Sequence, residues 1–215
     1  MTSFMRLAIA ILFVGFSGCS SMYYNTMEKV GIHKRDIMVD RVKEARDSQH
    51  EAKETITNAL DQFRSIVKFQ GGNLESQYNK LNRILEHSEA RADEVHERIA
   101  AVEDVSDALF REWKSELRQY SSKALRRSSE QKYNETRDKY ENMIAAMKNA
   151  ESKIAPVLEP LKDQVLYLKH NLNARAIAAL SDELLSVQTN VDALIRDMEA
   201  AIAEADTFIA ALSTE

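Results

Sequence analysis

Apolar residues recur through most of this chain in alternating steps of four and three residues, and this spacing constrains the fold more than any other feature. A mean period of 3.5 residues keeps one stripe of a helix facing a partner helix. Four such stripes follow one another: Met38 to Ile66, Leu74 to Tyr120, Tyr133 to Leu172 and Ile177 to Leu212. The spacing therefore predicts four long amphipathic helices.

The glycine and proline content argues against sheets. The 215 residues include only five Gly and two Pro, whereas hairpins and βα loops need frequent turn residues. We predict an all-α fold, a long antiparallel coiled-coil-like bundle of about four helices in an up-down-up-down order. The helices should cover roughly 26–70, 74–120, 128–170 and 174–212, and each would be ~60 Å long at 1.5 Å per residue.

Three turns should join these helices. Gly71-Gly72-Asn73 supplies a glycine that ends the first helix and an asparagine that caps the second. The second turn lies between residues 121 and 129, where either Ser122 or Ser128 could cap the third helix. The segment 171–173 is either a turn with an asparagine cap or a stutter in a continuous helix.

Two kinds of residue interrupt the stripes. Pro156 and Pro160 lie inside the third, where they predict either a kink or a fresh helix start with Pro156 at the first helical position. Gln49, Ser88 and Ser106 are polar at inward positions. Such residues more often fix register or partner choice than mark a ligand site.

The N-terminus reads as an export signal. A basic Arg6 precedes ten uncharged residues, Leu7 to Phe16, a run that is too short for the roughly 20 residues of a membrane span. The segment Phe16-Ser17-Gly18-Cys19 resembles the lipobox of bacterial lipoproteins. The resemblance implies that residues 1–18 are a signal peptide that is removed, and that Cys19 receives diacylglyceryl and N-acyl lipid. The alternative is an ordinary signal peptide with an incidental cysteine.

Cys19 is the only cysteine, so no disulfide can form within the chain. By resemblance to lipoprotein sorting, Ser20 in place of an aspartate implies the outer membrane, with the protein facing the periplasm. Residues 19–25 would then be a lipid-anchored segment and residues 26–212 a single bundle domain.

Three segments carry a wider resemblance: Tyr23–Asp36, Ala124–Glu130 and Gln164–Arg175. Through them the chain resembles an uncharacterised family of proteobacterial lipoproteins, known only as a domain of unknown function. The likeness covers the whole mature chain and implies no activity. No Gly-x-x-x-x-Gly-Lys-Ser/Thr run is present to hold a nucleotide, and a net charge of −5 does not favour nucleic acid.

Two Asp-x-x-His motifs are the sharpest candidate for a metal site. They are Asp47 with His50 and Asp93 with His96, and i,i+3 spacing puts each pair on one helix face. In an antiparallel hairpin, residues equally far from the turn lie at the same height. This reflection about the Gly-Gly turn brings each aspartate to the height of the other helix's histidine, as in carboxylate-bridged sites of four-helix bundles.

The stripes argue against that site. They turn Gln49, Ala52, Ala92 and Val95 inward, which leaves the four candidates beside or outside the core. We therefore expect no metal or other cofactor apart from the lipid on Cys19, and a solvated charge network at these positions.

A basic patch should gather at one end of the bundle. In an antiparallel hairpin the end of the second helix returns to the start of the first, beside Lys29, Lys34 and Arg35. The patch would comprise Arg111, Lys114, Arg118, Lys123, Arg126 and Arg127. It is either a second membrane anchor or a solvated helix end.

These patterns favour a non-enzymatic structural or protein-interaction role in the cell envelope. The hypothesis rests on long apolar stripes in a sequence that has no recognisable set of catalytic residues. The expected partners are the membrane, reached through the lipid anchor, and either an envelope protein or a second copy of the chain. The alternative is a membrane-lipid-binding module whose bundle opens to expose its apolar stripes. A metal-dependent bundle enzyme would rest on the Asp-x-x-His pairs alone.

Overall fold

The computed structural model describes residues 24, 26–27, 31–68, 71 and 73–213. Its long helices are α2 (Lys34–Val67), α3 (Leu74–Glu116), α4 (Lys123–Glu151), α5 (Ile154–His170) and α6 (Ala174–Ser213). The described residues contain helices and no strand. Among them, no helix combines the length and the apolar character that crossing a bilayer requires.

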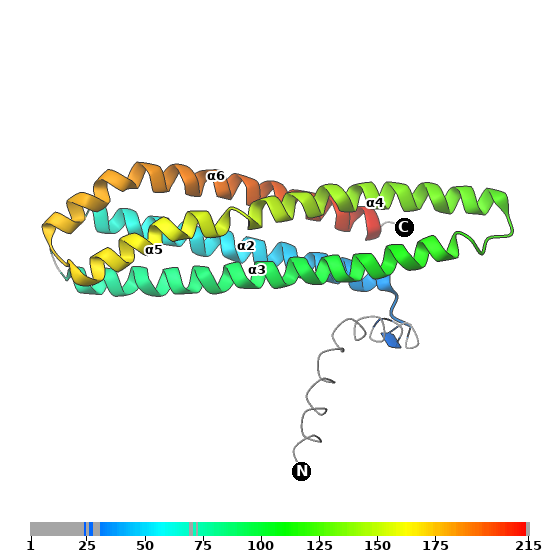
Figure 1. The fold of residues 1–215 in the computed structure, drawn as a ribbon, viewed down its shortest axis with the longest axis horizontal. Helices are drawn as coiled ribbons and strands as arrows, with labels where there is room; N and C mark the ends of the chain where they lie inside the picture. Colours follow the sequence, from blue (N-terminus) through cyan, green and yellow to red (C-terminus); the bar gives the residue numbers. More distant parts are fainter. Residues whose placement is uncertain (1–23, 25, 28–30, 69–70, 72, 214–215) are drawn as a thin grey trace, which may run out of the picture.

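The helices form an antiparallel bundle in which α4 and α5 follow one another as the third of four rods (Figure 1). Ion pairs join neighbouring rods side by side. Arg98 of α3 pairs with Glu44 of α2 at 2.9 Å, and Lys148 of α4 pairs with Glu103 of α3 at 2.7 Å. Arg46 of α2 pairs with Asp206 of α6 at 2.8 Å. The predicted all-α, up-down-up-down bundle is confirmed.

Side-chain caps settle the turns that the sequence left open. Asn73 accepts a hydrogen bond from the Ser76 backbone N–H at 3.0 Å, so it caps α3 as predicted. Ser122, not Ser128, caps α4. The segment 171–173 is a turn, in which the Asn173 side chain accepts from the backbone N–H of Ala176 at 3.1 Å.

Several predicted boundaries are wrong. The first long helix begins at Lys34 rather than near residue 26, because Gly31 interrupts the chain with φ +87°. The second ends at Glu116 rather than 120, and the third begins at residue 123 rather than 128. The third rod also breaks at residues 152–153. Pro156 is then the third residue of α5, where it has no intrahelical hydrogen bond to lose.

The core follows the predicted stripes closely. Every member of the first is fully buried, as are most inward residues of the other three. Two predicted members, Tyr120 and Leu172, are exposed instead. Both lie outside the helices, in turns, where the 3.5-residue period no longer applies.

The buried polar residues differ in how they are satisfied. Ser88 and Ser106 donate to carbonyl oxygens of their own helix, of Ile84 and Glu103. Gln49 instead reaches across the bundle, where its Nε2 donates to the Met147 carbonyl at 3.2 Å. Its Oε1 is buried without a partner among the described residues, so a change of register would bury a second unsatisfied group.

Candidate functional site

Cys19 and the signal segment 1–18 lie outside the described residues. The first described side chain is Tyr24, which is buried against α3 and donates from its hydroxyl to Asp104 Oδ2 at 2.6 Å. The chain is therefore fixed to α3 five residues after Cys19. Five residues span at most about 17 Å, which limits how far Cys19 can lie from Tyr24.

At the end of the bundle where α2 begins, the helices do not all stop at the same level. Lys34 pairs with Glu112 at 3.1 Å, and Arg35 donates to the Leu212 carbonyl, so α2 begins and α6 ends beside the same part of α3. The α3–α4 turn extends past both (Figure 1). We call residues 113–135 the overhang. Its α4 side, from Lys123 to Glu135, is about 18 Å long at 1.5 Å per residue.

Aromatic side chains hold the overhang together. The ring of Trp113 lies 5.7 Å from that of Tyr133 in an edge-on arrangement, and Phe110 contacts the same tyrosine at 5.6 Å. The indole N–H of Trp113 donates to Ser129 Oγ at 2.9 Å. Edge-to-face aromatic pairs add to the burial of their apolar area, and here they join α3 to α4.

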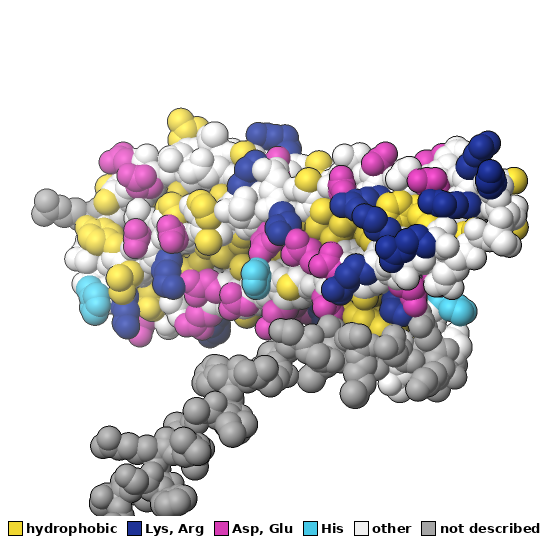
Figure 2. Space-filling view, turned by 45° about the vertical axis from the view of Figure 1, so that its right-hand side comes forward, with side chains coloured by type: hydrophobic (Ala, Val, Ile, Leu, Met, Phe, Trp, Pro, Cys, Tyr) yellow, Lys and Arg dark blue, Asp and Glu magenta, His cyan; other side chains and the backbone are white. Residues whose placement is uncertain are grey.

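The predicted basic patch lies on and next to the overhang. Its six members are all exposed, and we call them the basic cluster: Arg111, Lys114, Arg118, Lys123, Arg126 and Arg127. Figure 2 shows Lys and Arg side chains gathered toward this end of the molecule, beside hydrophobic ones. Lys34 and Arg35 lie at the same end, whereas Lys29 is outside the described residues.

The apolar residues at the overhang include two that sequence analysis did not single out as surface features. Tyr120, in the turn, is 42% exposed, and Leu125, in the first turn of α4, is 61% exposed. A hollow of about 200 Å³ lies at the base of the overhang. Leu109, Trp113 and Leu212 form its apolar wall, and Arg35 and Glu116 are among its polar residues.

The four metal candidates do not come together. Asp47 pairs with Arg46, which also binds Asp206 of α6, and His50 lies 3.3 Å from Glu54 of its own helix. His96 points to the other side and contacts Glu151 of α4, and Asp93 is exposed. The reflection placed the residues at the correct heights but not on facing sides of the helices. In the described part of the chain, no three His, Cys, Asp or Glu side chains converge on one point.

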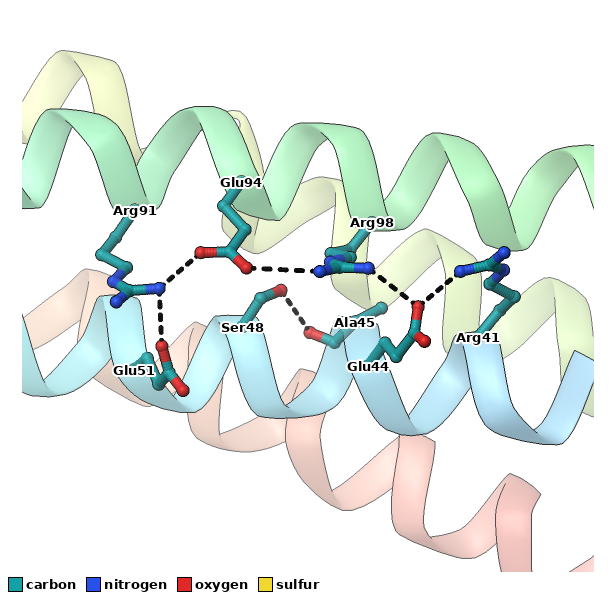
Figure 3. A network of polar contacts seen from close by, with 8 residues as sticks. All are labelled: Arg41, Glu44, Ala45, Ser48, Glu51, Arg91, Glu94 and Arg98. Atoms are coloured by element: carbon teal, nitrogen blue, oxygen red, sulfur yellow. Dashed lines mark hydrogen bonds and ion pairs between the residues drawn. The ribbon is translucent and has the colours of Figure 1, made fainter.

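The residues that do join α2 and α3 at this height are an alternating charge network (Figure 3). Arg98 contacts Glu44 at 2.9 Å and Glu94 at 3.6 Å, and Arg91 contacts Glu51 at 2.8 Å and also Glu94. Sequence reasoning missed them. The reflection applied to the histidines comes within one residue of pairing 44 with 98 and 51 with 91, so the signal was present in opposite charges at nearly equal heights.

The contact between His96 and Glu151 gives a prediction for pH. Their side chains lie 2.6 Å apart, and this hydrogen bond, followed by the charge of Glu151, raises the pKa of His96 above its ordinary 6.5. The contribution of the pair to stability is therefore complete below pH 6.5 and is lost as the pH rises through the raised pKa. We expect NMR titration to find the pKa of His96 above 6.5.

The replacement Glu151→Gln should return the pKa of His96 toward its ordinary value. The matched control is Glu103→Gln, which removes a carboxylate that binds Lys148 and not His96. An unchanged pKa of His96 in Glu151→Gln would contradict the contact.

The opposite end of the bundle carries exposed apolar side chains. Leu166 and Tyr167 lie in α5, Leu172 in the turn after it, and Leu185 in α6, where it is 75% exposed. Figure 2 shows hydrophobic side chains at this end as well. Exposed large apolar residues that gather toward one end of a molecule are a candidate surface for binding other molecules.

The comparisons with known proteins show one match. The model of a family described as "Protein of unknown function (DUF2959)" matches residues 23–212. No curated protein and no solved structure matches the chain.

Proposed function

Because the chain belongs to the DUF2959 family, whose description assigns no activity, we propose its function from its geometry: a lipid-anchored rod in the cell envelope that holds a protein-binding end away from the membrane. The observation that carries this proposal is one continuous core along antiparallel rods, of which α3 alone has 43 residues. Such a helix is about 65 Å long. The role is structural and non-enzymatic.

The two ends of the rod support different tasks. The N-terminal segment joins the bundle near the overhang, through Tyr24 on α3. The exposed Leu166, Tyr167, Leu172 and Leu185 lie toward the other end. An anchor on Cys19 would therefore hold one end at the outer membrane, on its periplasmic face, and direct the apolar end to an envelope protein or a second copy.

The closed bundle favours this role over a module that opens on lipid. Opening would expose side chains such as Phe63, Met147 and Leu161, which are fully buried. It would also break ion pairs between rods, including Lys153 with Asp197 at 2.7 Å. We therefore propose that the rod stays closed at the membrane.

Acylation of Cys19 is the experimental test. The full chain expressed in a bacterium should incorporate labelled palmitate and fractionate with the outer membrane. Cys19→Ser should abolish the label and accumulate precursor, and Ser20→Asp should keep the label but move the protein to the inner membrane. Ser21→Ala is the matched control and should behave as the unmodified chain. Normal retention of Cys19→Ser after high-salt washing would refute the anchor.

A second readout in the same cells tests the binding end. A photo-crosslinking residue at position 185 should capture one defined protein or a second copy of the chain. The control position is Lys139, which is exposed on α4. Equal capture from both positions would contradict a specific binding end.

A further inference from the structure

We propose that the overhang is a lipid-contact site: its turn enters the headgroup region of an anionic leaflet, and the basic cluster binds the lipid phosphates. The inference rests on the proposed membrane location, and it names a second attachment that does not require the lipid on Cys19. Its occupant is an anionic lipid surface.

The overhang projects beyond the ends of α2 and α6. α2 begins beside Glu112 and α6 ends beside Arg35, so both helices end at the base of the overhang, where Arg35 and Leu212 share a hollow with Trp113 and Glu116. Thr136 and Leu212 line the same hollow, which marks the level where α6 stops. In the described chain, the overhang is therefore the part of the bundle that projects farthest in this direction (Figure 1).

The tip of the overhang has exposed apolar side chains. Leu125 and Tyr120 are exposed there, although a helix pair with a fully water-facing end needs neither. A leucine at a projecting turn can enter the acyl boundary, and tyrosine has an apolar ring and a polar hydroxyl that suit the interface between hydrocarbon and water. Leu117, by contrast, is buried inside the overhang and supports its shape.

The overhang and the α3 residues next to it have an excess of positive charge. Residues 111–127 contain six basic and two acidic residues in a chain whose net charge is −5, so positive charge is concentrated at this end. Of the two acidic residues, Glu112 is bound by Lys34. Within the described residues, Arg118, Lys123, Arg126 and Arg127 form no ion pair, whereas cations along the body such as Arg91 and Arg98 do. Unpaired basic residues near a projecting apolar turn complement an anionic lipid surface.

The position of the N-terminal segment is compatible with both attachments. Tyr24 is held at Asp104, and α3 rises about 18 Å from Asp104 to Glu116. Because five residues reach at most about 17 Å, Cys19 can come to about the level of the overhang. A lipid chain and a basic segment together anchor a protein better than either does alone.

Vesicle binding by residues 20–215 tests the proposal. This segment includes every described core residue and lacks Cys19, so acylation cannot contribute. We expect binding to vesicles of one part phosphatidylglycerol and three parts phosphatidylcholine, with little binding to pure phosphatidylcholine. The quadruple replacement of Arg118, Lys123, Arg126 and Arg127 by glutamine should weaken binding at least tenfold, and Leu125→Gln should weaken it several-fold.

Matched variants separate a site from general charge or hydrophobicity. The charge control replaces four exposed cations elsewhere, Lys80, Arg83, Lys169 and Arg196, by glutamine. The apolar control is Leu185→Gln. Both should bind as the unmodified protein does, and circular dichroism should show all variants folded.

Three outcomes would overturn the proposal. They are equal binding to the two vesicle types, an equal loss of affinity in the charge control, and no vesicle binding at all, the result expected if the basic cluster instead served an acidic protein. None of them bears on acylation of Cys19, which is measured separately in cells, so this inference and the proposed anchor can fail independently.

Discussion

Replacing Phe63 with alanine should lower the free energy of unfolding by about 3–5 kcal/mol, the largest effect that we expect from a single substitution in the core. Phe63 is fully buried in α2 and is among the largest side chains with no exposed surface. Removing its ring deletes apolar burial and leaves a cavity that the surrounding rods can close only in part. Urea unfolding followed by circular dichroism at 222 nm measures the change.

Leu185→Ala is the matched control for this substitution. It removes a large apolar side chain from α6 that is mostly in water, so we expect a change within about 0.5 kcal/mol. A loss of less than 1 kcal/mol in Phe63→Ala would be inconsistent with the tightly packed core described above.

Arg98→Glu should be the most damaging change in the charge network, at about 2 kcal/mol. The replacement removes the contacts of Arg98 with Glu44 and Glu94 and places a third carboxylate beside them. Partly exposed pairs contribute up to about 1 kcal/mol each, and like charges at such distances repel by similar amounts. The network sits between α2 and α3 (Figure 3), so both effects weaken that contact.

Arg98→Gln separates the two effects, because it removes the positive charge without adding a negative one. It should cost about half as much as Arg98→Glu. In 1 M salt the difference between the variants should shrink, since screening weakens interactions between exposed charges. A difference that does not depend on salt would assign the effect to packing of the arginine side chain instead.

The fold could be predicted in detail because the apolar period determines which side of each helix is buried. All nine inward positions from Met38 to Ile66 are buried as the stripe predicts, including the polar Gln49. Caps with a single good candidate were equally predictable, and Asn73 is an example. Helix boundaries were less predictable, because Ser122 and Ser128 have the same capping chemistry and the sequence alone does not choose between them, whereas the structure places the cap at Ser122.

The candidate sites were predictable in position along the rods but not in direction around them. Reflection about a turn gives the height of a residue, and it placed Asp47 level with His96. It does not give the angle around the helix axis, and His96 therefore faces Glu151 of α4 rather than α2. The basic cluster could be predicted to lie at one end because only height was needed. Its projection beyond the other helices depends on where α2 begins and α6 ends, and Gly31 determines the first of these.

The overhang also divides the molecule mechanically. Along the body each rod packs against two neighbours, whereas beyond the ends of α2 and α6 the described part of the overhang is held by contacts between α3 and α4, such as Trp113 with Tyr133. Local opening costs less where fewer buried contacts must be broken. The four-rod part of the bundle is therefore rigid, and the overhang deforms more easily. The overhang can change shape against an uneven surface without changing the orientation of the rest of the bundle.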